Sequence, residues 1–156
     1  MLLRTHFVFN LFAFLLLINL KSFGFSFNWW FLLLFFLATC LPDIDIAGSF
    51  ISNKTKPVSN FIHAFTVHRE EFHSLLFALI FSLLVFLFSK SIVFAGIFFL
   101  FYFLHLFLDS LTKAGIKWFW PLDFVIKGKI KTHSLSEAII FLIFSLACIF
   151  LILIMI

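Results

Sequence analysis

Long apolar runs separated by short polar segments dominate the pattern of the chain. Five runs stand out, at about residues 2–20, 25–41, 74–89, 91–108 and 138–156. A helix needs roughly 20 residues to cross a bilayer core of about 30 Å, and these runs range from slightly short to adequate. The second run stops at Pro42, which cannot continue a helix. The pattern predicts an all-α integral membrane bundle of about five transmembrane helices, with residues 1–156 forming a single membrane-embedded domain.

Composition strengthens this prediction. Apolar residues make up 64% of the 156 positions and charged residues 12%, whereas soluble domains carry about 25% charged residues. Mean hydropathy is +1.22. These values exclude a soluble globular enzyme, a disordered chain and a polar nucleic-acid-binding module, and no direct binding of nucleic acid is expected. Cys40 and Cys148 lie within apolar runs and are interpreted as small buried residues.

The positive charges are distributed unevenly around the predicted spans. With five spans, the N-terminus and the segments 42–73 and 109–137 share one face of the membrane. Nine of the eleven Lys and Arg residues fall on that face, and only Lys21 and Lys90 fall on the other. This bias predicts a cytoplasmic N-terminus and a multi-pass protein of the cytoplasmic (inner) membrane. The first run, with Arg4 near its start and Gly24 after it, has an alternative interpretation as a secretory signal peptide. Trp118, Trp120 and Tyr102 are expected at the headgroup level as aromatic anchors.

Imidazole and carboxylate groups stand at the ends of these runs, where ionisable residues are costly and usually functional. His105 and Asp109 are four positions apart, about 40° on a helical wheel, so both can face one ion. The charge distribution places all of these ends on one face, where they can converge. The candidate metal ligands are His6, Asp43, Asp45, His68, His73, His105 and Asp109.

This set of side chains favours Zn²⁺, Mn²⁺ or Fe²⁺ as the bound ion. Seven ligands exceed what one tetrahedral ion takes, so two ions with an activated water molecule are plausible. Arg69 lies beside the ligands and could hold a phosphate oxygen. His68 and His73 are roughly 140° apart on a helical wheel, so the segment between them bends or one of the two is not a ligand. Taken singly, three of these residues have ordinary interpretations. His6 could be an interfacial residue and Asp43 a turn residue. Arg69 could be a positive charge that orients the helices in the membrane.

Several short blocks of the chain are similar to a known family. They are Thr5-His6, Leu41-Pro42-Asp43-Ile44-Asp45, His68-Arg69, His73-Ser74-Leu75, and His105-xxx-Asp109-xx-Thr112-xx-Gly115 followed by Trp120-Pro121. In this order, over roughly residues 5–140, the chain resembles the predicted membrane-bound metal-dependent hydrolases, which are YdjM-like and also described as LexA-binding inner-membrane hydrolases. That family is considered distantly similar to zinc-dependent phospholipase C.

The resemblance implies a hydrolase that holds its metal through the seven candidate ligands, with Zn or Mn expected and two ions as an option. It implies that Ser74, Thr112 and Glu137 support these ligands or cap helices. The expected partners are the lipid bilayer and a phospholipid or other phosphoester substrate. No recognisable DNA-binding motif accompanies the LexA-binding description.

The chain departs from the family pattern between its two central histidines. The family usually has a glycine and a threonine where this chain has Glu70 and Phe72. Glu70 or Glu71 could supply a carboxylate ligand or a general base, or the metal site is degraded. Three functions stay open: a hydrolase that uses metal-activated water on a phosphoester at the cytoplasmic face, with Arg69, Glu70 and Glu71 as catalytic residues; a cation or metal transporter; and a non-catalytic membrane scaffold.

Overall fold

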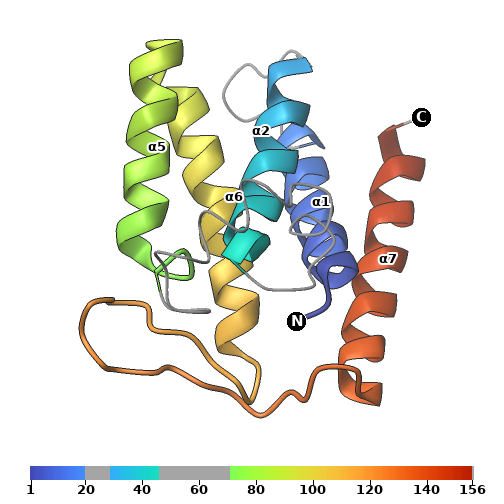
Figure 1. Cartoon of the computed structure of the whole chain (residues 1–156). Helices are drawn as coiled ribbons and strands as arrows, with labels where there is room; N and C mark the ends of the chain where they lie inside the picture. The colour runs from blue at the N-terminus through green and yellow to red at the C-terminus, as the bar shows by residue number, and fades with distance from the viewer. Residues whose placement is uncertain (20–28, 46–70, 156) are drawn as a thin grey trace.

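The computed structural model describes residues 1–19, 29–45 and 71–155 of the chain, which form an all-helical protein. The elements are α1 (Leu3–Asn19), α2 (Trp29–Cys40), the 3-10 helix η2 (Leu41–Asp45), α5 (Leu75–Ser89), α6 (Ile92–Ser110) and α7 (Leu135–Met155), as Figure 1 shows. The described residues contain two isolated β-bridges and no strand. The predicted all-α class is therefore confirmed, and the helices coincide closely with the apolar runs.

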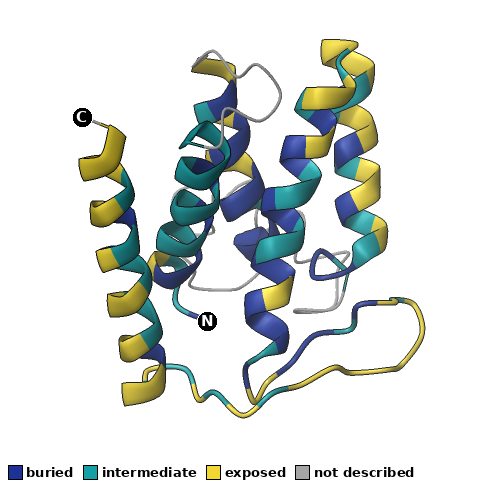
Figure 2. Cartoon of the chain, turned by 180° about the vertical axis from the view of Figure 1, so that it is seen from behind, coloured by how far each residue is buried: buried dark blue, intermediate teal, exposed yellow. Residues whose placement is uncertain are grey.

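Helix α6 lies at the centre of the bundle and contacts α1, α2 and α5, whereas α7 packs on α1 (Figure 1). The core between these helices is built mainly from aromatic and aliphatic side chains. Phe101 of α6 packs against Phe35 of α2 and Phe14 of α1, with ring centroids 5.4 and 6.2 Å apart. Figure 2 shows that burial concentrates on α6 and that α7 turns most of its surface outward. Such an outward apolar surface is typical of a helix that faces lipid.

Local sequence signals set the helix ends. Ser74 and Ser91 are the N-caps of α5 and α6, and their hydroxyls accept hydrogen bonds from Phe77 N and Phe94 N, each at 3.4 Å. Lys90, at φ 54°, ends α5 in the left-handed conformation and donates its backbone N–H to Phe86 O at 2.7 Å. Helices α5 and α6 are therefore joined through Lys90 and Ser91 into a tight hairpin.

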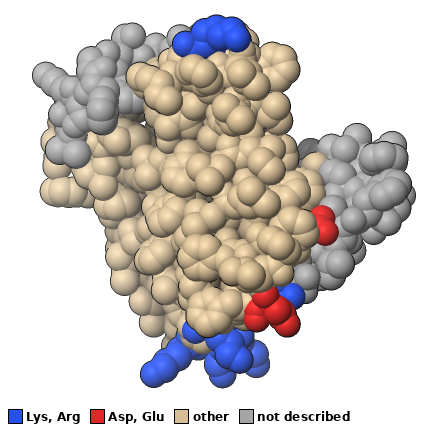
Figure 3. All heavy atoms as spheres, turned by 90° about the vertical axis from the view of Figure 1, so that its left-hand side faces the viewer, with Lys and Arg blue, Asp and Glu red and all other residues tan. Residues whose placement is uncertain are grey.

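Two of the described helices are long and apolar enough to cross a membrane, namely α6 with 19 residues and α7 with 21. Helices α1, α2 and α5 are apolar but shorter. Figure 3 views the molecule from the α5 side, where Lys and Arg gather at two opposite ends and a broad band between them contains none. Length and composition thus support a membrane protein with two candidate spans, which is fewer than the five that the sequence predicts.

The expectation of three aromatic anchors is wrong for two of them. Tyr102 is fully buried in the core, where its hydroxyl donates to Phe72 O at 2.6 Å. Trp118 is also buried and packs against Phe103, with ring centroids 5.2 Å apart. Both rings contribute to the packing inside the protein and are not exposed at a membrane surface.

Candidate metal centre

Four ligand-bearing side chains from three separate parts of the sequence meet inside the bundle. Asp43 comes from η2, His73 precedes α5, and His105 and Asp109 lie one turn apart on α6. One ligand atom of each residue lies within 4.8 Å of the ligand atoms of the other three, and all four side chains are buried. Two imidazoles and two carboxylates at this spacing could hold a divalent ion.

Imidazoles and carboxylates face one another across this cluster. His73 Nε2 lies 3.3 Å from Asp109 Oδ2 and 3.6 Å from Asp43 Oδ1. His105 Nε2 lies 3.6 Å from Asp43 Oδ1 and 3.8 Å from Asp109 Oδ2. The Nε2 atom of each histidine therefore faces both carboxylates. This is the arrangement expected of four metal ligands around a common centre.

The environment of His105 fits a metal ligand. Its Nδ1 lies 2.8 Å from the carbonyl oxygen of Thr39, and since a carbonyl can only accept, Nδ1 carries the proton. The lone pair is then on Nε2, which is buried and has no hydrogen-bond partner among the described residues. A buried polar atom without a partner is unfavourable unless something else satisfies it. A cation bound by this nitrogen would do so.

The backbone segments that carry Asp43 and His73 are fixed from outside the cluster. Pro42 stands in η2, where α2 gives way to a tighter turn that brings Asp43 inward. The Tyr102 hydroxyl holds the Phe72 carbonyl beside His73, and Ser74 Oγ donates to Glu71 O at 2.7 Å. Such supports restrict the orientation of the side chains that ligate a metal.

His6 joins the edge of the cluster from α1. Its ring is fully buried and stacks on that of His105, with centroids 3.8 Å apart and an interplanar angle of 8°. Its Nε2 lies 3.3 Å from Asp109 Oδ1, the oxygen that also accepts a hydrogen bond from the Met1 amino nitrogen. His6 is thus placed beside the four-residue group and on the opposite carboxylate oxygen from His73.

The sequence-based candidates fall into three classes in the structure. Asp43, His73, His105 and Asp109 come together, with His6 alongside. Glu71 is half-buried and is not part of the four-ligand group. The predicted site residues His68, Arg69 and Glu70, and the side chain of Asp45, lie outside the part of the chain that the structure describes.

The residues expected to support the ligands make hydrogen bonds around the cluster. Thr112 Oγ1 donates to Asp109 O at 2.7 Å and accepts from Gly115 N at 3.3 Å, which closes the turn after α6. Glu137 is buried and accepts from Leu2 N at 2.6 Å and from His133 N at 2.8 Å. It therefore ties the start of α7 to the start of α1, next to His6.

Sequence reasoning overlooked two supports that the structure reveals. Asn10 is buried between α1, α2 and α6, where its Nδ2 donates to Thr39 Oγ1 at 2.9 Å and to Phe101 O at 3.2 Å. A lone amide inside an apolar run was a signal that could have drawn attention to it. Thr39 is the second support, because its backbone carbonyl oxygen contacts His105 Nδ1. A backbone contact of this kind leaves no signal in the sequence.

Glu137→Ala is expected to loosen the junction of α1 and α7. The substitution leaves the backbone N–H groups of Leu2 and His133 without their acceptor. Both hydrogen bonds are only part-buried, so the loss costs about 0.5–1.5 kcal/mol for each of them. Hydrogen–deuterium exchange of peptides that cover residues 1–8 and 130–137 should become faster. Asp123→Ala, which removes an exposed carboxylate, is the control and should leave both peptides unchanged. Equal exchange in both variants would contradict the role of Glu137.

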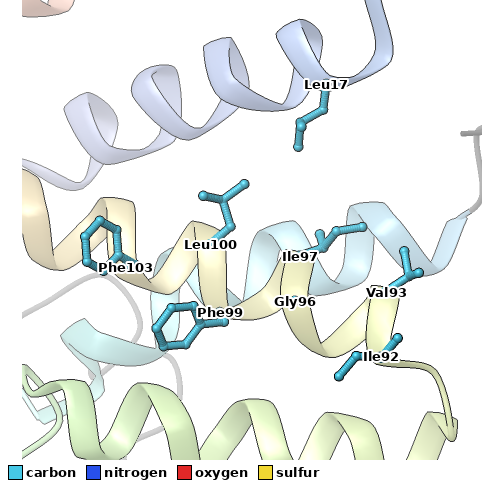
Figure 4. A pocket seen from close by; sticks show the side chains of 8 residues that line it. All are labelled: Leu17, Ile92, Val93, Gly96, Ile97, Phe99, Leu100 and Phe103. Carbon is cyan, nitrogen blue, oxygen red and sulfur yellow. The ribbon is translucent and has the colours of Figure 1, made fainter. Parts of the chain in front are cut away.

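Two large recesses among the described residues lie away from this chemistry. One of ≈ 550 Å³ between α1 and α6 is lined by Leu17, Gly96, Leu100 and other apolar residues, which Figure 4 shows. A second, of ≈ 620 Å³, lies among α2, α5 and α6 and is also apolar apart from Ser89. Neither offers a metal ligand, so the polar cluster is the candidate functional site.

Comparison with known proteins agrees with the resemblance in the sequence. A protein-family model described as "YdjM inner membrane protein" matches residues 1–156. No curated protein matches the chain. No solved structure matches it either.

Proposed function

Because the chain belongs to the YdjM inner membrane protein family, we propose that it is a metal-dependent hydrolase of the membrane that cleaves a phosphoester at the cytoplasmic face. The observation that carries this proposal is the buried group of Asp43, His73, His105 and Asp109. Buried carboxylates and imidazoles in an otherwise apolar bundle are unfavourable without a functional role. Hydrolysis is the reaction class that such ligand sets commonly serve.

We assign all five helices α1, α2, α5, α6 and α7 to the membrane, as a multi-pass bundle with the N-terminus in the cytoplasm. The shorter helices are apolar and pack alongside α6 and α7 in the same bundle. Five lysines lie in the segment after α6 at one end of the bundle, and Lys90 lies in the hairpin at the other. This asymmetry of positive charge supports a cytoplasmic location for the end that carries the cluster.

The four residues of the cluster would hold Zn or Mn, and His6 beside Asp109 would extend the site to a second ion. When bound, the metal would supply Lewis acidity toward a phosphoryl oxygen and make a water molecule more acidic. The carbonyl of Thr39 keeps the Nε2 lone pair of His105 directed at the cluster. Burial of all four side chains keeps competing bulk water away from the ligands.

Three residues that precede His73 are assigned the remaining roles. Arg69 would hold a substrate phosphate oxygen through its planar guanidinium group. Glu70 or Glu71 would accept the proton of the attacking water. These roles are supported by the position of the three residues in the sequence, shortly before the cluster residue His73.

The packing around the cluster favours hydrolysis over cation transport. An ion path needs polar side chains through the depth of the bundle. In the part of the chain that the structure describes, Phe98 and Phe101, no more than 2% exposed, fill the interior of the bundle along α6. The buried polar side chains at that depth, Asn10 and Thr39, are uncharged and are hydrogen-bonded to each other at 2.9 Å. These residues therefore form no row of ionisable groups for an ion path.

Asp43→Asn is expected to reduce phosphoester hydrolysis by the reconstituted full chain about 100-fold or more, since loss of a ligand charge disturbs metal affinity and water activation together. The assay uses protein loaded with Zn²⁺ or Mn²⁺ and measures phosphate or headgroup release from phosphatidylglycerol vesicles and from a nitrophenyl phosphodiester. Asp123→Asn is the matched control, because Asp123 is an exposed carboxylate paired with Lys117 at 2.8 Å. Equal rates in the two variants, or no hydrolysis by the loaded wild type on either substrate, would refute the proposal.

A further inference from the structure

The segment that joins α6 to α7, residues 111–134, forms a defined loop that extends sideways at one end of the bundle, toward the side of α5 (Figure 1). Paired backbone hydrogen bonds link Ile116 and Ile126, from N to O at 3.1 Å and in return at 3.0 Å. Lys113 N donates to Ile130 O at 2.8 Å, and Ile130 N donates to Leu111 O at 3.0 Å. These bonds divide the loop into a tip, residues 117–125, and a base formed by the residues on either side.

The tip is attached to the helices. Leu75 N, at the start of α5, donates to Trp118 O at 2.9 Å. The Trp118 ring packs on Phe103, and the Trp120 ring lies 6.1 Å from that of Phe77. In the base, a side chain at Gly128 would collide with the backbone of Leu111, so the two arms approach as closely as glycine allows. The position of the loop relative to the bundle is therefore fixed by contacts.

The tip exposes large apolar side chains. Phe119, Leu122 and Phe124 are 51%, 65% and 60% exposed, and Val125 is exposed beside them. The tip has one acidic residue, Asp123, which is paired with Lys117. A contiguous exposed apolar patch in a surface loop marks a surface that contacts lipid or another partner.

The base carries the opposite chemistry. Lys113, Lys127, Lys129 and Lys131 are all exposed and have no acidic neighbour in the sequence of the loop other than Asp123. An apolar edge bordered by lysines is the pattern of segments that lie in the interface of an anionic membrane, since the lysines attract lipid phosphates while the apolar groups enter the acyl boundary.

We propose that residues 117–125 insert into the boundary between headgroups and acyl chains, and that the four base lysines bind the phosphates of anionic lipids in the same leaflet. Charge complementarity selects an anionic lipid over a second protein, because the four exposed lysines of the base stand next to the apolar tip. The loop extends toward the side of α5 (Figure 1), so with α5 in the membrane, as proposed above, the tip lies at the lipid surface. The interaction rests on that part of the proposed function and is independent of any hydrolytic activity.

The depth of the tip is tested with nitroxide labels in vesicles of phosphatidylcholine and phosphatidylglycerol. Leu122→Cys labels the tip and Lys129→Cys labels the base, in a background where Cys40 and Cys148 are replaced by alanine. The label at position 122 should be accessible to oxygen and protected from a water-soluble nickel complex, and the label at 129 should show the reverse. If the alanine background fails to fold, the native cysteines are retained, because both are buried, and Phe124→Cys provides a second tip position. Equal accessibility of the tip and base labels to nickel overturns the insertion.

The choice of lipid is tested by native mass spectrometry of the full chain in mixed phosphatidylglycerol and phosphatidylcholine. Wild-type protein should retain phosphatidylglycerol several-fold more often than phosphatidylcholine. Replacing Lys113, Lys127, Lys129 and Lys131 by Gln should abolish this preference, while Lys90→Gln, at the opposite end of the bundle, should leave it intact. A preference that survives the four substitutions shows that the lysines do not select the lipid and overturns that half of the proposal.

Discussion

His105→Ala combined with Asp109→Ala is expected to leave the purified protein without its divalent metal. Both residues contribute ligand atoms to the group within 4.8 Å, and both lie on α6, so the pair of substitutions removes one whole side of the cluster. Loss even of a residue that only orients a ligand weakens metal binding about 10–100-fold. Loss of two ligands should therefore bring the metal content to background, as measured by mass spectrometry of the protein purified without added metal and after loading with Zn²⁺ or Mn²⁺.

A matched control separates loss of ligands from loss of structure. Asp123→Ala removes a carboxylate that is exposed, and its metal content should equal that of the wild type. His73→Ala provides a single substitution in a different part of the chain and should also lower the metal content. Equal metal in the wild type and in the double variant would show that the cluster does not hold the ion, and the proposed hydrolase would lose its main support.

Phe101→Ala is expected to produce the largest loss of stability of any single apolar truncation in the bundle. Phe101 is fully buried on α6 and packs against Phe35 and Phe14, and its carbonyl accepts the hydrogen bond of Asn10. Truncation of a buried phenylalanine to alanine costs about 3–5 kcal/mol, since the bundle closes only partly around the cavity. Reversible unfolding in mixed detergent micelles, followed by circular dichroism, measures the free energy of unfolding.

The corresponding control is Phe88→Ala on α5. Its side chain is 88% exposed and makes little internal packing, so its free energy of unfolding should stay within about 0.5 kcal/mol of the wild type. A loss of similar size in both variants would mean that aromatic content, and not the packing between α1, α2 and α6, stabilises the fold.

The helices could be predicted from the sequence because lipid and core both demand continuous apolar runs. Four helices begin and end within a few residues of the predicted runs. For the run at 25–41, the described part begins at Trp29 and α2 covers it to Cys40. Crossing of the membrane is harder to predict from such runs. Helices α1, α2 and α5 are apolar enough but short, and their lengths alone decide neither for nor against a span.

The candidate site could be predicted in part, because the position of a ligand in the sequence limits where it can point. The four-residue spacing of His105 and Asp109 forces both onto one face of α6, and the structure has them together. The contacts of Thr39 O with His105 and of Tyr102 with Phe72 O join residues that are 66 and 30 positions apart. No local pattern encodes such contacts, since they arise only when α2, α5 and α6 pack.

Helix α6 has a consequence for how this chain can vary. The same helix packs against three others and presents His105 and Asp109 to the cluster. One extra residue inserted between Ala95 and Leu104 would keep the helix as apolar as before, but it would rotate everything beyond it by about 100°. The insertion would thus move both ligands away from Asp43 and His73. The register of α6, more than its hydrophobicity, is what related sequences must preserve.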